Sequence, residues 1–395
     1  MVTVVLGSIV EDCEPVANVR VPHLSDAERA ECQDAIKYLT DDGRVKGFHI
    51  LCNRGEEGVL IFLEGTADVV RMEYAPYLGP DSVGDSHLQD LLRAALEDKV
   101  IMGVEFRDGS RDRRAQPWRL FSLDGKVEAS LYEQDTAFLF EGGQWIWPGV
   151  RVGFKQFVDL EDGSVPAEIE TISLRPLVLK VRNFLGHEEC DFIRRDAMSH
   201  MINSPVALMD HDRGKQATEW RTSTQTFMSS SEYRYLKDVD RRVAALTRLP
   251  LGNQEDVQVL RYQEGQKYDA HHDFFNMDNY RKDKGVQKLL NYGHRNRLAT
   301  VFWYLTDVAE GGSTWFPRAN GFEAPGMPGG AESFKSCEPD VGIHSYPEKG
   351  KVIIFYSLLP NGKGDDLSLH GGCPPLSTGE EKWSANKWIW NAPPR

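Results

Sequence analysis

The stretch YQEGQKYDAHHD, residues 262–273, decides how the second half of this chain is interpreted. The run that leads into it, residues 257–262, is rich in β-branched and aromatic residues and is typical of a strand. Alternate side chains of a strand share a face, so His271 and Asp273 can point at one metal ion while His272 points away. Such a pair by itself is usually a surface pair, so the interpretation depends on further ligands elsewhere in the chain.

A second segment, SLHGGCP at residues 368–374, supplies His370 as the candidate for a third ligand. It follows the apolar run 351–356, which predicts a buried strand that could lie near the first one. Two histidines and one carboxylate suit non-haem Fe(II) and leave positions open for a co-substrate and for O2. The sequence therefore predicts an iron site made by His271, Asp273 and His370.

Twelve residues after His370 comes Lys382, at the start of the run KWSANKWIW. As a strand, this run would put Lys382, Trp388 and Trp390 on one face. A lysine buried among aromatic rings is costly without an anion, and a carboxylate of a co-substrate would be a natural partner. The alternative is a lysine at the end of a strand with its ammonium group in water.

These segments and others together resemble the prolyl 4-hydroxylase family of Fe(II)/2-oxoglutarate dioxygenases. Each matching piece is weak alone, but all of them occur in the order of the family over about residues 176–395. The pieces are residues 181–185, 188–190, 221–223, 262–273, 297–300, 304–317, 370–374 and 382–388. One departure is visible, because two extra residues lie between His370 and Lys382, and we expect the polar turn 377–381 to absorb them.

The resemblance implies a role for each matching position. The iron ligands would be His271, Asp273 and His370. The 2-oxoglutarate site would be formed by Lys382 at the distal carboxylate, with Tyr262, Thr300 and Trp388 around the co-substrate. The peptide substrate would lie near Arg221, Ser223 and Tyr268.

The activity implied by the resemblance is hydroxylation of peptidyl proline at C4, with release of succinate and CO2. The expected cofactors are Fe(II), 2-oxoglutarate as co-substrate and ascorbate, and the expected partner is a proline-containing peptide or protein. Two alternatives stay open. One is an oxygenase of the same class that acts on another residue or on a small molecule, and the other is a peptide-binding module without turnover.

The expected fold class is α+β. Strands near 257–263, 267–274, 298–305, 314–316, 351–356, 367–371 and 386–391 suit a double-stranded β-helix, or jelly roll. Helices over 187–200 and 232–247 would brace one sheet. We expect two domains, because 395 residues exceed one typical domain. They are an accessory domain at 1–170 and the dioxygenase domain at 171–395.

Residues 1–170 carry no motif with a chemical role, and a mixed, mostly β domain is expected there. A helix should begin after Ser25 and run to about residue 39, and strands are expected at 58–63 and 69–74. A first strand at 1–10 and a second helix at 87–96 are also expected. The domain would either recruit a protein substrate or only support the barrel. The aromatic segment 145–149 is expected to pack between elements rather than to bind a ligand.

A net charge of −14 argues against nucleic acid and anionic membranes as partners. The six cysteines form no C-x-x-C pair, so a structural zinc site is not expected. Most of them are expected to be free and buried, although the resemblance suggests a disulfide between Cys337 and Cys373. No signal peptide, retention signal or glycosylation acceptor is evident, which favours a cytoplasmic location, although a trimmed leader would look the same.

The loop 276–296 is interpreted either as a mobile lid or as a plain surface loop.

Overall fold

The computed structural model describes residues 19–21, 24–40, 47–72, 119–125, 135–206, 209–210, 216, 220–319, 337–359 and 362–394. The described residues up to Gln144 form one compact unit, and those from Trp145 onward form a second. We call them the N-terminal unit and the C-terminal unit. The division lies before the predicted boundary at 170, because β7 (Lys155–Val158) and β8 (Ala167–Leu174) pair into the large sheet of the C-terminal unit.

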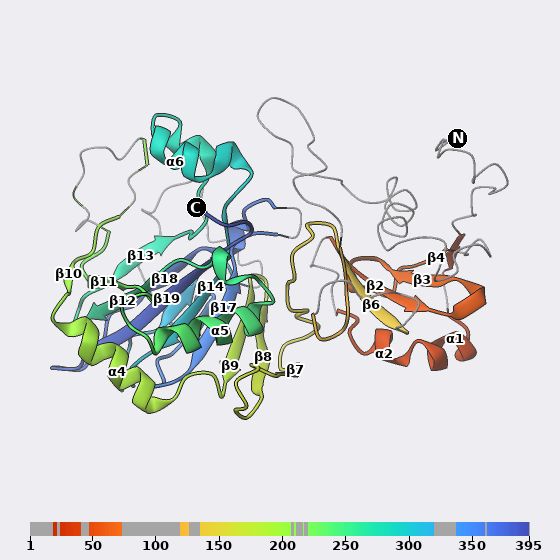
Figure 1. Ribbon diagram of the computed structural model, residues 1–395, viewed down its shortest axis with the longest axis horizontal. Helices are drawn as coiled ribbons and strands as arrows, with labels where there is room; N and C mark the ends of the chain where they lie inside the picture. Colours follow the sequence, from red (N-terminus) through yellow and green to blue (C-terminus); the bar gives the residue numbers. More distant parts are fainter. Residues whose placement is uncertain are drawn as a thin grey trace. The chain divides into compact units, whose positions relative to one another are not determined.

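The N-terminal unit is built on a six-stranded antiparallel sheet in the order β1-β4-β3-β2-β6-β5. Its strands are β1 (Val19–Val21), β2 (Phe48–Asn53), β3 (Val59–Phe62), β4 (Val69–Met72), β5 (Arg119–Phe121) and β6 (Thr136–Phe140). Its helices are α1 (Asp26–Glu31) and α2 (Gln33–Ile36), with the 3₁₀ turns η1 (Gly55–Glu57) and η2 (Leu63–Gly65) (Figure 1). The expected helix after Ser25 and both expected strands are confirmed. The strand at 1–10 and the helix at 87–96 lie outside the described residues.

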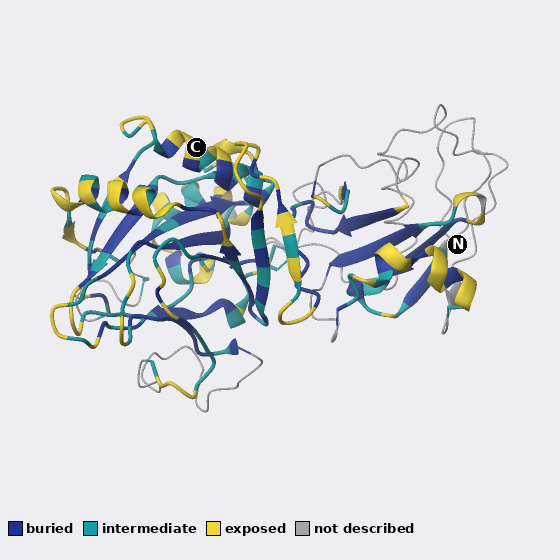
Figure 2. Cartoon of the chain, turned by 90° about the horizontal axis from the view of Figure 1, so that it is seen from below, coloured by how far each residue is buried: buried dark blue, intermediate teal, exposed yellow. Residues whose placement is uncertain are grey.

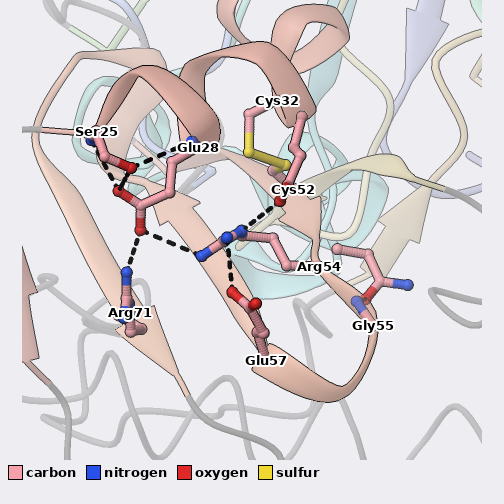
Figure 3. Close-up of polar contacts among 10 residues, drawn as sticks. Ser25, Glu28, Cys32, Cys52, Arg54, Gly55, Glu57 and Arg71 are labelled. Atoms are coloured by element: carbon pink, nitrogen blue, oxygen red, sulfur yellow. Dashed lines mark hydrogen bonds and ion pairs between the residues drawn. A yellow bond between two sulfur atoms is a disulfide. The ribbon is translucent and has the colours of Figure 1, made fainter.

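A buried carboxylate ties α1 to the sheet. Ser25 and Glu28 form a capping box, in which each side chain accepts a hydrogen bond from the backbone N–H of the other. The Glu28 carboxylate also accepts bonds from Arg54, at 3.2 Å, and from Arg71 (Figure 3). These bonds join the first helical turn to the end of β2 and to β4, so the cluster fixes how the helix lies on the strands.

Two disulfides correct the expectation that most cysteines are free. Cys32, just after α1, is bonded to Cys52 in β2 (Figure 3). The disulfide between Cys337 and Cys373, which the resemblance suggested, is confirmed. Cys190 is a buried thiol, as expected for a small apolar side chain. The first pairing could not be inferred from sequence, because it depends on the helix packing directly on β2.

The C-terminal unit is made of two antiparallel sheets (Figure 1). The larger has the order β10-β11-β12-β19-β14-β17-β9-β8-β7, and the smaller has the order β13-β18-β15-β16. Its further strands are β9 (Leu177–Arg182), β10 (Ile202–Asn203), β11 (Thr224–Met228), β12 (Val257–Tyr262), β13 (Tyr268–His271), β14 (Arg297–Tyr304), β15 (Thr314–Phe316), β16 (Ile343–Ser345), β17 (Val352–Tyr356), β18 (His370–Gly372) and β19 (Lys382–Trp390). The chain passes between the sheets from β12 to β19, which gives the strand order of the predicted jelly roll.

The core of this unit lies between the two sheets. Buried apolar residues of the large sheet, such as Leu260, Phe302 and Phe355, pack with Phe316 of the small sheet. Figure 2 shows most of the large sheet as buried, while β7 is an exposed edge strand of that sheet. The inner face of the large sheet therefore both fills the core and forms one wall of any site inside the barrel.

Helices cover the other face of the large sheet. They are α4 (His187–Met198) and α5 (Leu236–Thr247), close to the predicted ranges. Arg194 of α4 lies 5.7 Å from the ring of Trp383, which points outward from β19. Trp147 also has a packing role, since its backbone N–H donates to Tyr356 and its ring N–H donates to the Leu246 carbonyl. The structure thus agrees with packing as the use of the aromatic segment 145–149.

The expected loop at 276–296 is partly helical. It contains α6 (Lys284–Leu289) and the 3₁₀ turns η5 (Met277–Tyr280) and η6 (Asn291–Gly293), and further 3₁₀ turns are η4 (Leu251–Asn253) and η9 (Asp366–Ser368). Asp283 caps α6 by accepting a hydrogen bond from the Val286 N–H. The helix was not predicted, because the segment is rich in charged residues. Its role as a lid stays a prediction. Within the described ranges, no helix is both long and apolar enough to cross a membrane.

Candidate metal centre and co-substrate pocket

The predicted iron ligands come from two strands that pair with each other. β13 and β18 run antiparallel, with His271 directly opposite His370. The short turn after β12 contains Gly265 with φ of +73°, a conformation that glycine adopts without strain. This turn returns the chain onto the small sheet and brings His271 to the barrel interior.

Asp273 joins the two histidines two residues beyond β13. Its carboxylate oxygens lie 3.8 Å from Nε2 of His271 and 3.6 Å from Nε2 of His370. One ligand atom from each of the three residues lies within 4.8 Å of the others. These separations are too long for hydrogen bonds and short enough for the three groups to share one ion. The described residues thus contain the predicted triad, and its donor set fits Fe(II).

Main-chain carbonyls orient both imidazole rings. Nδ1 of His271 lies 2.9 Å from the carbonyl oxygen of Asp269, and Nδ1 of His370 lies 2.9 Å from that of Ser368. Because a carbonyl only accepts, each Nδ1 carries the proton and each Nε2 keeps its lone pair for a metal. Burial, together with repulsion between protonated His271 and His370, lowers the pKa of His271 to about 3, so its ring is neutral.

The carboxylate of Asp273 is held ionised. Burial alone would raise its pKa, but attraction to the rings of His370 and His271 when they are protonated, and to the Arg297 guanidinium, lowers it to about 2. The hydroxyl of Thr300 donates a hydrogen bond of 2.6 Å to the same carboxylate. Thr300 was predicted to lie near the co-substrate. Its direct contact is instead with a predicted iron ligand, so it orients that ligand, and contact with 2-oxoglutarate stays a prediction.

Lys382 points into the barrel interior, as predicted. Only 1% of the residue is exposed, and its ammonium group lies 5.0 Å from the ring of Tyr262 and 3.5 Å from the Ser313 carbonyl oxygen. Across the described part of the chain it has no carboxylate partner within ion-pair distance. Burial lowers its pKa to about 7. A buried cation of this kind is stabilised when an anion enters beside it.

The two extra residues before Lys382 do not displace it, because the turn that holds them is anchored. Glu381 accepts a two-pronged bond from Arg261 on β12 and also accepts the ring N–H of Trp383. Lys382 therefore pairs with Tyr262 in the ladder between β12 and β19. As predicted, the insertion is accommodated outside the strands.

The co-substrate candidates form two pairs along the inner face. Tyr262 lies opposite Lys382 at one end, and Trp388 lies opposite Thr300 at the other, beside Asp273. Burial raises the pKa of Tyr262, so its phenol stays protonated and can donate a hydrogen bond. Together the pairs span the inner face of the large sheet between the triad and Lys382.

The three predicted substrate residues are also brought together. The buried guanidinium of Arg221 lies 4.5 Å from the ring of Tyr268, which stacks on His271 at 3.7 Å. Nε of Arg221 donates to the Ser223 hydroxyl and Nη1 donates to a main-chain carbonyl, but the buried Nη2 has no partner among the described residues. An unpaired buried donor beside the triad suits a carbonyl of a bound peptide.

Sequence reasoning missed two features of this site. Arg297 stacks on Trp388 at 3.6 Å and forms a two-pronged bond to Glu255, and only its place in the motif 297–300 gave a signal for it. The second feature is a ladder of amides, in which Gln258 donates to Gln225 at 2.6 Å and accepts from Asn386 at 2.9 Å. No local pattern could reveal this ladder, because it joins three strands that are distant in sequence.

Comparison with known proteins points to one family. Residues 257–390 match the family described as the 2OG-Fe(II) oxygenase superfamily. "Prolyl 4-hydroxylase 2" of Arabidopsis thaliana is 37% identical over 225 residues, which cover 57% of this chain and 70% of that relative. "Probable prolyl 4-hydroxylase 4" of the same plant is 38% identical over 225 residues, with the same shares.

Among solved structures, a viral collagen prolyl hydroxylase from Paramecium Bursaria Chlorella virus-1, in complex with 2OG, matches 54% of this chain and 95% of its own. The sequence identity is 25% and the TM-score is 0.37. The family match at 257–390 lies within the C-terminal unit and includes His271, Asp273, His370 and Lys382.

Proposed function

Because the chain belongs to the prolyl 4-hydroxylase family of 2OG-Fe(II) oxygenases, and is an Fe(II)/2-oxoglutarate-dependent dioxygenase, we propose that it hydroxylates C4 of a peptidyl proline. The observation that carries this proposal is the convergence, inside one barrel, of the triad, a buried lysine with no carboxylate partner among the described residues, and an arginine N–H group with no partner among them. A module that only binds peptides would require neither the triad nor the buried lysine.

Fe(II) would be held by His271, Asp273 and His370. When bound there, it supplies the oxygen activation that couples loss of CO2 from 2-oxoglutarate to oxidation of the substrate. The protein contributes fixed ligand geometry. The two carbonyls that hold Nδ1 of each histidine, and the hydroxyl of Thr300 on Asp273, restrict each ligand to one orientation before metal arrives.

Lys382 would bind the distal carboxylate of 2-oxoglutarate. The ammonium group is buried among Tyr262, Phe302 and Tyr304, at 5.0, 5.7 and 6.0 Å from their ring centres. These rings exclude water, so a charge-assisted bond to the carboxylate is stronger than it would be at the surface. The phenol of Tyr262, which burial keeps protonated, would donate a second bond to the same group.

The peptide would enter beside Tyr268. The stack of Arg221 on Tyr268, and of Tyr268 on His271, puts an aromatic ring and a guanidinium next to the metal ligands. Proline rings pack well on aromatic side chains, and a proline-rich peptide offers carbonyl oxygens to Nη2 of Arg221. Trp388, which lies opposite Thr300 in the strand ladder, would close the other side.

The proposal is tested by incubating the protein with Fe(II), 2-oxoglutarate and a panel of proline-containing peptides. We expect succinate to accumulate with a suitable peptide, and the peptide to gain the mass of one oxygen atom on proline. Oxidation of another residue or of a small molecule would favour the alternative hypothesis, an oxygenase of the same class with a different substrate. Absence of succinate under all conditions would favour the binding module. Omitting ascorbate from the same assay tests whether it sustains turnover, which stays a proposal.

We further propose that the N-terminal unit is an accessory domain that positions a protein substrate or partner. Its support is a separate core, in which Phe48 packs edge-on against Phe138, and its own disulfide between Cys32 and Cys52. All ten predicted site residues lie in the C-terminal unit. The competing proposal is that this unit only supports the barrel.

A further inference from the structure

His272 lies between two predicted iron ligands, but its ring is turned to the other side of the chain. Its Nε2 lies 3.2 Å from the carbonyl oxygen of Asp366. Because a carbonyl only accepts, Nε2 carries the proton and donates. This bond joins the residue just beyond β13 to the turn η9, which comes just before β18.

The turn η9 is a compact unit. A second donor, Nη1 of Arg318, reaches the same Asp366 carbonyl at 2.8 Å. The Asp365 carboxylate accepts the Leu367 N–H at 2.9 Å, and the Asp365 carbonyl accepts both the N–H and the hydroxyl of Ser368. Because these bonds link residues 365–368, the position of Asp366 also determines the position of Ser368.

The turn η9 also orients the third predicted metal ligand, His370. Ser368 supplies the carbonyl that accepts Nδ1–H of His370 at 2.9 Å, with one residue between them. A separate contact fixes the same segment, because Phe274 packs so closely on Gly364 that a Cβ there would lie 2.2 Å from the ring. Residues 272–274 thus contact residues 364–368 twice, through the His272 hydrogen bond to Asp366 and through the packing of Phe274 on Gly364.

We propose that His272 is a positioning residue for the metal site. By donating to the Asp366 carbonyl it holds η9, and through Ser368 it sets the orientation and tautomer of His370. It does not touch the metal or the substrate. The inference rests on the proposed iron site, and it reverses the expectation from strand alternation alone, which gave His272 no role.

The competing explanation is a bond that stabilises the fold without serving the metal. The two explanations differ in what they change. A bond that only stabilises the fold lowers the unfolding temperature of the metal-free protein and leaves the affinity of the folded protein for metal intact. A positioning bond weakens metal affinity by a factor that the change in unfolding temperature does not account for.

The experiment measures the dissociation constant of Co(II), used as the metal alone, by titrating metal-free protein without 2-oxoglutarate. His272→Phe keeps an aromatic ring and removes the donor, and should weaken binding by about tenfold, as is usual for a group that orients a ligand. His272→Gln keeps an N–H donor at nearly the position of Nε2 and should bind close to the unchanged protein. His200→Phe changes an exposed histidine beyond α4 and is the matched control.

Co(II) affinity of His272→Phe equal to that of the unchanged protein would overturn the inference. His370→Ala is measured in the same series. If it also binds Co(II) normally, the proposed iron site itself is wrong, so the two failures can be told apart. If His272→Phe does not fold, Arg318→Met removes the other donor to Asp366 and must show the same direction of change for the inference to stand.

Discussion

Replacing His271, Asp273 or His370 with Ala removes one of three protein ligands, so we expect turnover to be abolished in each variant while the fold is kept. Circular dichroism and thermal unfolding would check the fold, and succinate release would check turnover. If a variant keeps normal turnover, the residue that it replaces is not a metal ligand.

Replacing Lys382 with Ala should raise the concentration of 2-oxoglutarate required for half-maximal rate by tenfold or more. The reason is that a charge-assisted bond contributes roughly 1.5–3 kcal/mol, and about 1.4 kcal/mol corresponds to a factor of ten. Lys387→Ala is the control, because Lys387 lies 2.6 Å from Asp240 in an ion pair and is not available to the co-substrate. An unchanged requirement in Lys382→Ala would show that another cation binds the carboxylate.

The lowered pKa of Lys382, about 7, predicts a pH dependence. Below this pH the lysine is charged before 2-oxoglutarate arrives. Above it, binding must take up a proton, so the requirement for 2-oxoglutarate should rise as pH increases, by up to about tenfold per pH unit. Lys382→Arg stays charged throughout and should lose this dependence. A requirement that is flat from pH 6.5 to 8.5 in the unchanged protein would contradict the burial of a free lysine.

Among the elements, strands carrying site residues were predictable because their signals are local. Alternation predicted that His271 and Asp273 point the same way, which they do although β13 already ends at His271, and the apolar run 351–356 marked β17. The boundary of the C-terminal unit was not predictable. Whether β7 and β8 join one sheet or another depends on pairing with β9, and their own sequences do not encode it. The amide ladder escaped prediction for the same reason, since its members meet only after three strands have paired.

This pairing predicts where the C-terminal unit can be cut. A fragment that begins at Glu168 lacks β7 and Trp147, which bonds to Tyr356 and to the Leu246 carbonyl. We expect it to aggregate, because the loss exposes apolar surface. A fragment that begins at Trp145 keeps these contacts and should be soluble, with cooperative thermal unfolding. Equal solubility of the two fragments would show that Trp147 and β7 contribute little to the unit.

In the whole molecule, the fragment from Trp145 also separates the two proposals for the N-terminal unit. If that unit recruits a protein substrate, the fragment should hydroxylate short peptides normally and lose activity on the full protein substrate. Full activity on both would contradict recruitment. The expected cytoplasmic location stays a prediction, and the two disulfides argue for an oxidising compartment instead. Fractionation of the source cells would decide between the two.

The most direct test of the central claim is the fate of isotopically heavy O2 in a reaction with 2-oxoglutarate and a proline peptide. The site geometry predicts one heavy oxygen atom in succinate and one at C4 of proline for each turnover, and neither product with His370→Ala. Succinate formed without any heavy oxygen in the peptide, or label on a residue other than proline, would contradict the assignment of this barrel as a prolyl 4-hydroxylase.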